Sequence, residues 1–207
     1  MKFDRKCLKL YAVTDRRWSI NQTLYTQIEQ ALKGGVTLVQ LREKDLDEEE
    51  FIKEAMDIKK LCHQYNVPLI INDNLKVAIE SQADGIHIGQ DDIEIEIVKK
   101  RFPHKIIGVT AHNLKEAMEA QDKGADYLGI GAVFPTSTKT NTTPLSIEGI
   151  KEITSHISIP CVAIGGIEKS NINLLKDSGI DGVAVVSAIF KSDNIENTVK
   201  ELLEELR

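Results

Sequence analysis

The run Gln40-Leu41-Arg42-Glu43-Lys44 brings an amide, a guanidinium and an ammonium group together at the end of an apolar segment. Side chains alternate along a strand, so Gln40, Arg42 and Lys44 would share one face. Charges are costly to bury without partners, and an anion with several oxygens, such as phosphate or pyrophosphate, would satisfy this set. The alternative is that Arg42 and Lys44 pair with the acids beside them, Glu43 and Asp45.

Two carboxylates, Asp73 and Asp92, follow two other apolar segments. Mg²⁺ takes few protein ligands and completes its shell with water and phosphate oxygens, so it suits carboxylates beside a bound anion. Helix capping by Asp91 or Asp92, and by Asn72 or Asp73, is the alternative. Two carboxylates on neighbouring strand ends, facing Arg42 and Lys44, favour the metal.

Two further parts of the chain offer donors to an anion. The segment Thr136-Ser137-Thr138-Lys139 supplies hydroxyls, backbone N–H groups and one ammonium, although a polar loop without a ligand would look the same. Gly165-Gly166 either lets the backbone approach a ligand or forms only a tight turn. With Val186-Ser187 it predicts a second anion site, built from neutral backbone donors.

Short apolar runs alternate with amphipathic segments along the whole chain, which predicts strands followed by helices. The expected strands are Leu10–Val13, Thr37–Leu41, Leu69–Ile71, Gly85–Ile88, Ile106–Val109, Tyr127–Ile130, Cys161–Ile164 and Val183–Val186. The expected helices are Leu24–Lys33, Glu48–Tyr65, Leu75–Ser81, Ile93–Lys100, Leu114–Lys123, Ile147–Thr154, Ser170–Asp177 and Ile195–Leu206.

This alternation predicts an α/β fold in which parallel strands are covered by helices, and the number of units predicts a single compact (β/α)8 TIM barrel over residues 1–207. An open doubly wound sheet is the alternative, but Thr14-Asp15-Arg16-Arg17 is not the glycine-rich turn that usually follows its first strand. In a barrel, the polar residues after each strand converge on one face. We therefore place the candidate site there.

Composition narrows the class of protein. The net charge is −6, from 26 basic and 32 acidic residues, which argues against nucleic acid as a general partner. No run is long and apolar enough for a membrane span or a signal peptide. The three cysteines lack metal or disulfide spacing, so a cytoplasmic location is expected. The oligomeric state is left open, and a homo-oligomer is compatible with the sequence.

The chain resembles the thiamine phosphate synthase family over essentially its whole length. The similarity rests on seven segments in order, each after an expected strand, which together are more specific than any one of them. They are Tyr11–Asp15, Gln40–Lys44, Ile71–Asp73, His87–Asp92, Pro135–Lys139, Ile164–Ile167 and Val186–Ile189.

The resemblance implies a transferase of thiamine biosynthesis that joins an aminopyrimidine methyl pyrophosphate to a thiazole ethyl phosphate and releases pyrophosphate. By similarity, Gln40 would hold the pyrimidine, and Asp73 and Asp92 would hold Mg²⁺. The pyrophosphate would contact Arg42, Lys44, Asn72, Thr110, Thr136, Thr138 and Lys139. The thiazole phosphate would contact the backbone at Gly166, Val186 and Ser187. Arg42, Lys44, Thr110 and Lys139 are the expected catalytic residues.

One position departs from the family pattern: Thr110 stands where a serine is usual, and it keeps the hydroxyl. A related thiazole tautomerase is the alternative function, with His112 as its functional residue, but such relatives tend to lose the metal and pyrophosphate residues. A non-catalytic sensor of phosphorylated ligands is the alternative outside enzymes. His87, between two isoleucines, is expected to be a satisfied interior residue.

Overall fold

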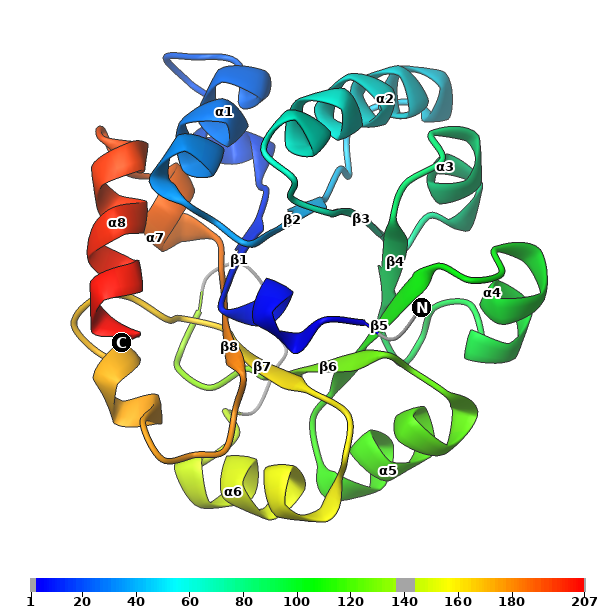
Figure 1. The fold of residues 1–207 in the computed structure, drawn as a ribbon, viewed down its shortest axis with the longest axis vertical. Helices are drawn as coiled ribbons and strands as arrows, with labels where there is room; N and C mark the ends of the chain where they lie inside the picture. Colours follow the sequence, from blue (N-terminus) through cyan, green and yellow to red (C-terminus); the bar gives the residue numbers. More distant parts are fainter. Residues whose placement is uncertain (1–2, 137–143, 207) are drawn as a thin grey trace.

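The computed structural model describes residues 3–136 and 144–206, whose strands close into a parallel barrel in chain order (Figure 1). The last strand returns to pair with the first. The strands are β1 (Leu10–Val13), β2 (Leu38–Leu41), β3 (Leu69–Asn72), β4 (Gly85–Ile88), β5 (Ile106–Ala111), β6 (Tyr127–Gly131), β7 (Cys161–Ile164) and β8 (Gly182–Val185). The expected (β/α)8 barrel is confirmed.

Helices surround the strands as an outer ring (Figure 1). They are α1 (Leu24–Gly34), α2 (Glu48–Gln64), α3 (Leu75–Glu80), α4 (Ile95–Arg101), α5 (Leu114–Lys123), α6 (Ile147–His156), α7 (Ser187–Phe190) and α8 (Ile195–Glu205). The 3₁₀ turns are η1 (Arg5–Leu8), η2 (Arg16–Trp18) and η3 (Ile172–Leu175). Among the described residues, no helix combines the length and the apolar character needed to cross a membrane.

Two predicted elements are corrected. The helix expected over Ser170–Asp177 is only the turn η3, and Asp177 ends that segment with a positive φ of 62° that no helix continues. The last strand ends at Val185 rather than Val186, because the backbone then turns into the short helix α7 at Ser187. A helix of four residues is too short to show hydrophobic periodicity, so α7 could not be predicted from the sequence pattern.

Apolar side chains fill two separate layers. The larger cluster lies between the strands and the helices and includes Val39, Leu41 and Ile58. The smaller one fills the barrel interior and includes Leu38 and Ile70. The N-terminal turn η1 covers the amino end of the barrel, where Leu8 joins the interior cluster (Figure 1). Alternation along β2 thus sends Leu38 and Gln40 inward and Val39 and Leu41 outward.

A repeated turn before every second strand has a structural role. The carboxylates of Asp84, Asp126 and Asp181 each accept a backbone N–H from the neighbouring strand, at 2.8 to 2.9 Å. The three donors are Leu69, Ile107 and Cys161. These bonds tie adjacent strands together at the amino end of the barrel, and they leave the opposite end for the site.

Candidate active site

A cleft opens at the carboxyl ends of the strands, where most of the sequence-predicted ligand residues meet. Eight of them line it: Gln40, Arg42, Asn72, Thr110, Thr136, Gly166, Val186 and Ser187. Those on β2 to β5 form one side of the barrel mouth, and those after β7 and β8 form the other, as the strand order requires. The cleft therefore has the two-sided layout that two anionic groups would need.

The backbone of Arg42 is held by the end of β1. The buried Thr14 hydroxyl accepts a hydrogen bond from the Arg42 N–H at 2.9 Å and donates to its carbonyl at 3.4 Å. The N–H of Thr14 donates to the Gln40 carbonyl at 3.0 Å. Three bonds thus fix the position from which Gln40 and Arg42 extend.

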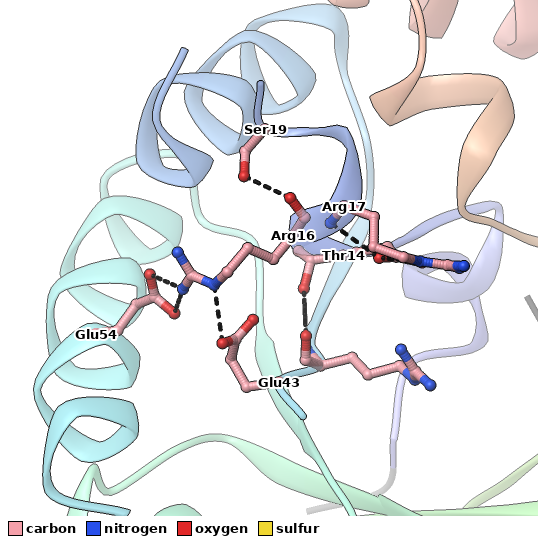
Figure 2. Close-up of polar contacts among 8 residues, drawn as sticks. Thr14, Arg16, Arg17, Ser19, Glu43 and Glu54 are labelled. Carbon is pink, nitrogen blue, oxygen red and sulfur yellow. Dashed lines mark hydrogen bonds and ion pairs between the residues drawn. The ribbon is translucent and has the colours of Figure 1, made fainter. Parts of the chain in front are cut away.

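The other side of this run is clamped by Arg16. Its guanidinium donates to Glu43 at 2.9 Å and to both carboxylate oxygens of Glu54 on α2 at 2.7 Å (Figure 2). The Glu43 side chain is only 2% exposed, and burial raises its pKa while Arg16 offsets part of the rise. Glu43 is therefore a structural partner of Arg16.

Pairing of Arg42 and Lys44 with Glu43 and Asp45, the alternative raised by the sequence, is wrong. Glu43 bonds to Arg16, and Lys44 bonds to Asp73 at 2.9 Å. Within the described ranges 3–136 and 144–206, the Arg42 guanidinium has no ion pair. A cation facing the cleft is thus left for a ligand.

Lys44, Asp73 and Asp92 come together beside the cleft, although they are not among the residues that line it. The two carboxyl groups are close enough to interact directly. Burial raises both pKa values, but the Lys44 ammonium brings that of Asp73 below its ordinary range. The pKa of Asp92 stays above its ordinary value because burial and the neighbouring Asp73 outweigh the Gly89 N–H.

Helix capping does not account for either carboxylate. The N-cap of α3 is Asn74, whose side chain accepts from the Val77 N–H at 3.0 Å. The N-cap of α4 is Glu94, without a side-chain bond. Asp92 instead accepts from the Gly89 N–H at 2.6 Å, and Asp73 has a positive φ of 60°, a strained conformation more common at functional sites.

The carboxylate pair fits a divalent cation of the Mg²⁺ type. Mg²⁺ is bound by one or two carboxylates together with waters and phosphate oxygens, and two carboxyl groups in contact repel each other until a cation or proton lies between them. Among the described residues, no group of three or more His, Cys, Asp or Glu side chains could hold a metal. A cation at Asp73 and Asp92 would thus draw its remaining ligands from water and substrate.

The glycine pair after β7 is required by packing. Gly165 and Gly166 have φ values of 103° and 63°, and a Cβ on Gly166 would lie 2.4 Å from the Pro135 carbonyl oxygen. The Gly166 carbonyl also accepts from the Asn171 amide at 2.9 Å. Gly166 therefore forms a tight turn that packs closely against Pro135. Gly166 also borders the cleft.

Two histidines line the cleft in different settings. His112 is held by Glu116, which accepts from its backbone N–H at 2.8 Å and contacts its Nδ1 at 2.9 Å. His87 is 8% exposed and contacts Tyr127 and Thr110 through its two ring nitrogens. The expectation of a satisfied interior His87 is confirmed.

Sequence reasoning missed Tyr11 and Tyr127, which reach into the barrel interior, where Tyr11 also lines the cleft. The available signal was two tyrosines at inward positions of strands, since buried tyrosine hydroxyls usually have hydrogen-bond partners. Ser137, Thr138 and Lys139 lie outside the described residues, within the segment 137–143 of the loop between β6 and α6. The roles predicted for Thr138 and Lys139 stay predictions.

Comparisons with known proteins agree on one family. The family model described as Thiamine monophosphate synthase matches residues 10–189. The chain is 46% identical to the thiamine-phosphate synthase of Clostridium novyi, over 94% of this chain and 96% of that protein. It is 47% identical to that of Clostridium tetani, over 93% of each. A solved thiamine phosphate pyrophosphorylase from Pyrococcus furiosus is 37% identical with a TM-score of 0.92, covering 98% of this chain and 96% of that one.

Proposed function

The chain belongs to the thiamine monophosphate synthase family, and we propose that it joins an aminopyrimidine methyl pyrophosphate to a thiazole ethyl phosphate. The products are thiamine phosphate and pyrophosphate. The observation that carries the proposal is that the Arg42 guanidinium, which makes no ion pair among the described residues, faces a cleft that has a carboxylate pair, Asp73 and Asp92, beside it. The cytoplasmic location expected from the sequence belongs to the same proposal.

The pyrophosphate end of the first substrate would bind on the β2 to β5 side. Arg42, Asn72 and Thr110 border the cleft there, and Lys44 lies beside it. Thr136, which follows β6, also borders the cleft. Arginine donates to phosphate oxygens in a bidentate fork, and a lysine adds a point charge. Thr138 and Lys139 would join this set by similarity to the family. These donors stabilise the negative charge that develops on the leaving group.

The remaining contacts divide between the pyrimidine and the thiazole. Gln40 faces the cleft from β2, where its amide can pair with the edge of an aminopyrimidine. Gly166, Val186 and Ser187 border the opposite side, where their backbone groups would meet the thiazole phosphate. Neutral donors there match a phosphate that stays intact, whereas the cations face the group that leaves.

The chemistry suits a dissociative step. The carbon–oxygen bond to the pyrophosphate breaks with its electrons, and the electron-rich aminopyrimidine stabilises the methylene cation that remains. The thiazole nitrogen then attacks this carbon. Because that nitrogen carries no proton, no strong base is required. The protein's part is to bind both substrates in line, stabilise the departing charge and keep water from the cation.

Mg²⁺, when bound, would neutralise charge on the pyrophosphate oxygens and so assist their departure. Asp73 and Asp92 are the residues that would hold it. Lys44, which pairs with Asp73 at 2.9 Å, would place an ammonium group beside the same site.

The test is formation of thiamine phosphate and pyrophosphate from the two substrates, with Mg²⁺ and with chelator. Product formation that chelator abolishes supports the proposal, and Asp73→Asn or Asp92→Asn should lower it by about tenfold or more. The exposed neighbour Asp91, as Asp91→Asn, is the matched control and should turn over normally. Absence of product from a folded protein that binds thiazole phosphates would favour the tautomerase, with His112 next for mutation, or the sensor.

A further inference from the structure

Five polar side chains form a continuous hydrogen-bonded chain across the floor of the cleft. The Gln40 Nε2 lies 2.7 Å from the Tyr11 hydroxyl, which lies 2.8 Å from the Tyr127 hydroxyl. The Tyr127 hydroxyl is 3.0 Å from Nδ1 of His87, whose Nε2 is 2.9 Å from the Thr110 hydroxyl. The chain therefore joins the residue expected at the pyrimidine to one expected at the pyrophosphate.

This hydrogen-bonded chain of side chains is buried, and the fold leaves room for it. Tyr11, Tyr127 and Gln40 are at most 3% exposed. Glycines take the adjacent inward positions, since a Cβ on Gly108 would lie 2.1 Å from the Tyr127 ring and 2.5 Å from Nδ1 of His87. Burial raises the pKa of both tyrosines, so their hydroxyls keep their protons and act as donors.

The heavy-atom positions allow two orders of donors and acceptors along the chain. In the first, the Gln40 amide nitrogen donates to Tyr11, each tyrosine donates onward, Nδ1 of His87 accepts, and its Nε2–H donates to Thr110. In the second, every bond reverses and Gln40 accepts through its amide oxygen. A neutral imidazole has one donor and one acceptor nitrogen, so either order satisfies it.

A ligand anion distinguishes the two orders. In the first, the Thr110 hydroxyl has accepted from His87 and its own proton remains to donate into the cleft. In the second order, the Thr110 hydroxyl donates its proton to His87. Only its lone pairs then face the anion, and they repel the anion. The first order also leaves the Gln40 amide oxygen to accept from an exocyclic amine of the pyrimidine.

We propose that this hydrogen-bonded chain has a single direction of donation, from Gln40 to Thr110. In this arrangement His87 is a positioning residue that directs the Thr110 proton toward the pyrophosphate. The identity of the anion rests on the proposed function, whereas the polarity of the chain does not. One consequence is that the pyrimidine end and the pyrophosphate end of the first substrate contact opposite ends of the same series of hydrogen bonds. Another is that the choice of protonated ring nitrogen in His87 sets the direction in which Thr110 donates.

The tautomer can be measured without substrate. Nitrogen NMR of the isotope-labelled histidine rings at pH about 8, above the ordinary histidine pKa of about 6.5, separates a protonated Nε2 from a protonated Nδ1. His87→Gln identifies the His87 signals. We expect the proton on Nε2 in the unmodified protein. A proton fixed on Nδ1, or an even mixture of tautomers, would overturn the proposal.

The effect on the anion is tested with inorganic pyrophosphate and Mg²⁺ by calorimetry. Tyr127→Phe keeps the ring but removes the donor to His87, and should weaken binding by about fivefold. The same change in a Thr110→Val background should cost nothing further, because the chain acts through that hydroxyl. Thr110→Ser should restore binding, and the exposed Tyr25, as Tyr25→Phe, is the matched control.

Additive losses in the double variant would assign Tyr127 a purely structural role and overturn the proposal, as would unchanged affinity in Tyr127→Phe. If Tyr127→Phe unfolds, Tyr11→Phe provides the second route, since it cuts the chain one link earlier. A protein that shows the Nε2 tautomer yet forms no thiamine phosphate would contradict the proposed function and leave the polarity standing.

Discussion

The Thr14 hydroxyl bonds to both backbone groups of Arg42, accepting from its N–H at 2.9 Å and donating to its carbonyl at 3.4 Å. Thr14 directly follows β1, and Arg42 directly follows β2, so a fully buried side chain joins the carboxyl ends of neighbouring strands. Regular strand pairing has stopped at this point. The hydroxyl therefore replaces the missing sheet bonds and sets the base of the Arg42 side chain.

Replacing Thr14 with valine keeps the shape and removes this bridge. The Arg42 N–H would lose its partner, at a cost of about 1–3 kcal/mol in the free energy of unfolding. We expect kcat/KM to fall by about tenfold or more, because a shift of the guanidinium weakens its hold on the leaving group. Thr14→Ser retains the hydroxyl and should behave nearly as the unmodified enzyme. Equal activity in the valine and serine variants would show that the bridge does not position Arg42.

Arg16 is expected to act at a distance through Glu43. Arg16→Gln removes the charge that compensates a buried carboxylate, and should lower the free energy of unfolding by about 1–3 kcal/mol and also reduce turnover. Denaturant unfolding and steady-state kinetics measure the two effects. Lys60→Gln, which breaks the exposed pair with Asp57, is the control and should cost no more than about 0.5 kcal/mol. A similar loss in both variants would argue against a special role for the Arg16 clamp.

The two cations assigned to the leaving group can be removed singly. Arg42→Ala and Lys139→Ala should each lower turnover by about tenfold or more, the equivalent of about 1.4 kcal/mol of transition-state stabilisation. The fold should survive, because Arg42 makes no ion pair among the described residues. Circular dichroism checks the fold and product formation checks the rate. Near-normal rates in either variant would remove that residue from the proposed site.

The contact between Glu116 and His112 predicts a pH-dependent stability. Burial raises the pKa of Glu116, but the backbone N–H and ring of His112 outweigh it, so this pKa lies below its ordinary value. The stability contributed by the charged form is thus present above the ordinary glutamate pKa of about 4.3 and is lost as pH falls through the lower, folded pKa.

Glu116→Gln keeps an oxygen acceptor and removes the charge. The unmodified protein should be more stable than this variant by up to about 1 kcal/mol at neutral pH, and the difference should vanish near pH 3. Urea unfolding at the two pH values measures it. A difference that persists in acid would mean that shape, and not charge, accounts for the contact.

The fold was largely predictable, because strand and helix periods differ and a barrel uses them in strict alternation. Each of the eight strands overlaps its predicted range. The errors fell where local signals are weak: η3 contains Asn173 and is preceded by Asn171, and α7 is too short to show a period. Boundaries moved by a residue or two, as at Val186, where the strand gives way to a turn.

The convergence of polar residues on one cleft was predictable, whereas the contacts among them were less so. Eight predicted ligand residues do line one cleft, since the ends of parallel strands must meet. The partner of Lys44 was not predictable from neighbouring acids, because Asp73 lies 29 positions away and reaches it only through the pairing of β2 and β3. The sequence also could not show whether Asp92 caps the following helix or accepts a hydrogen bond from the Gly89 N–H.

The barrel, the polar residues at its rim and the family could all be predicted from residue types, their period and their order. Which charged groups pair with one another, and which remain available for a ligand, depends on the three-dimensional arrangement of the strands. Glu43 is taken by Arg16, Asp73 by Lys44, and Arg42 is left facing the cleft. The buried chain from Gln40 to Thr110 likewise exists only in three dimensions, since five strands supply one residue each. Local sequence patterns indicate the secondary structure that a residue favours, whereas its ion-pair or hydrogen-bond partner is set by the closure of the barrel.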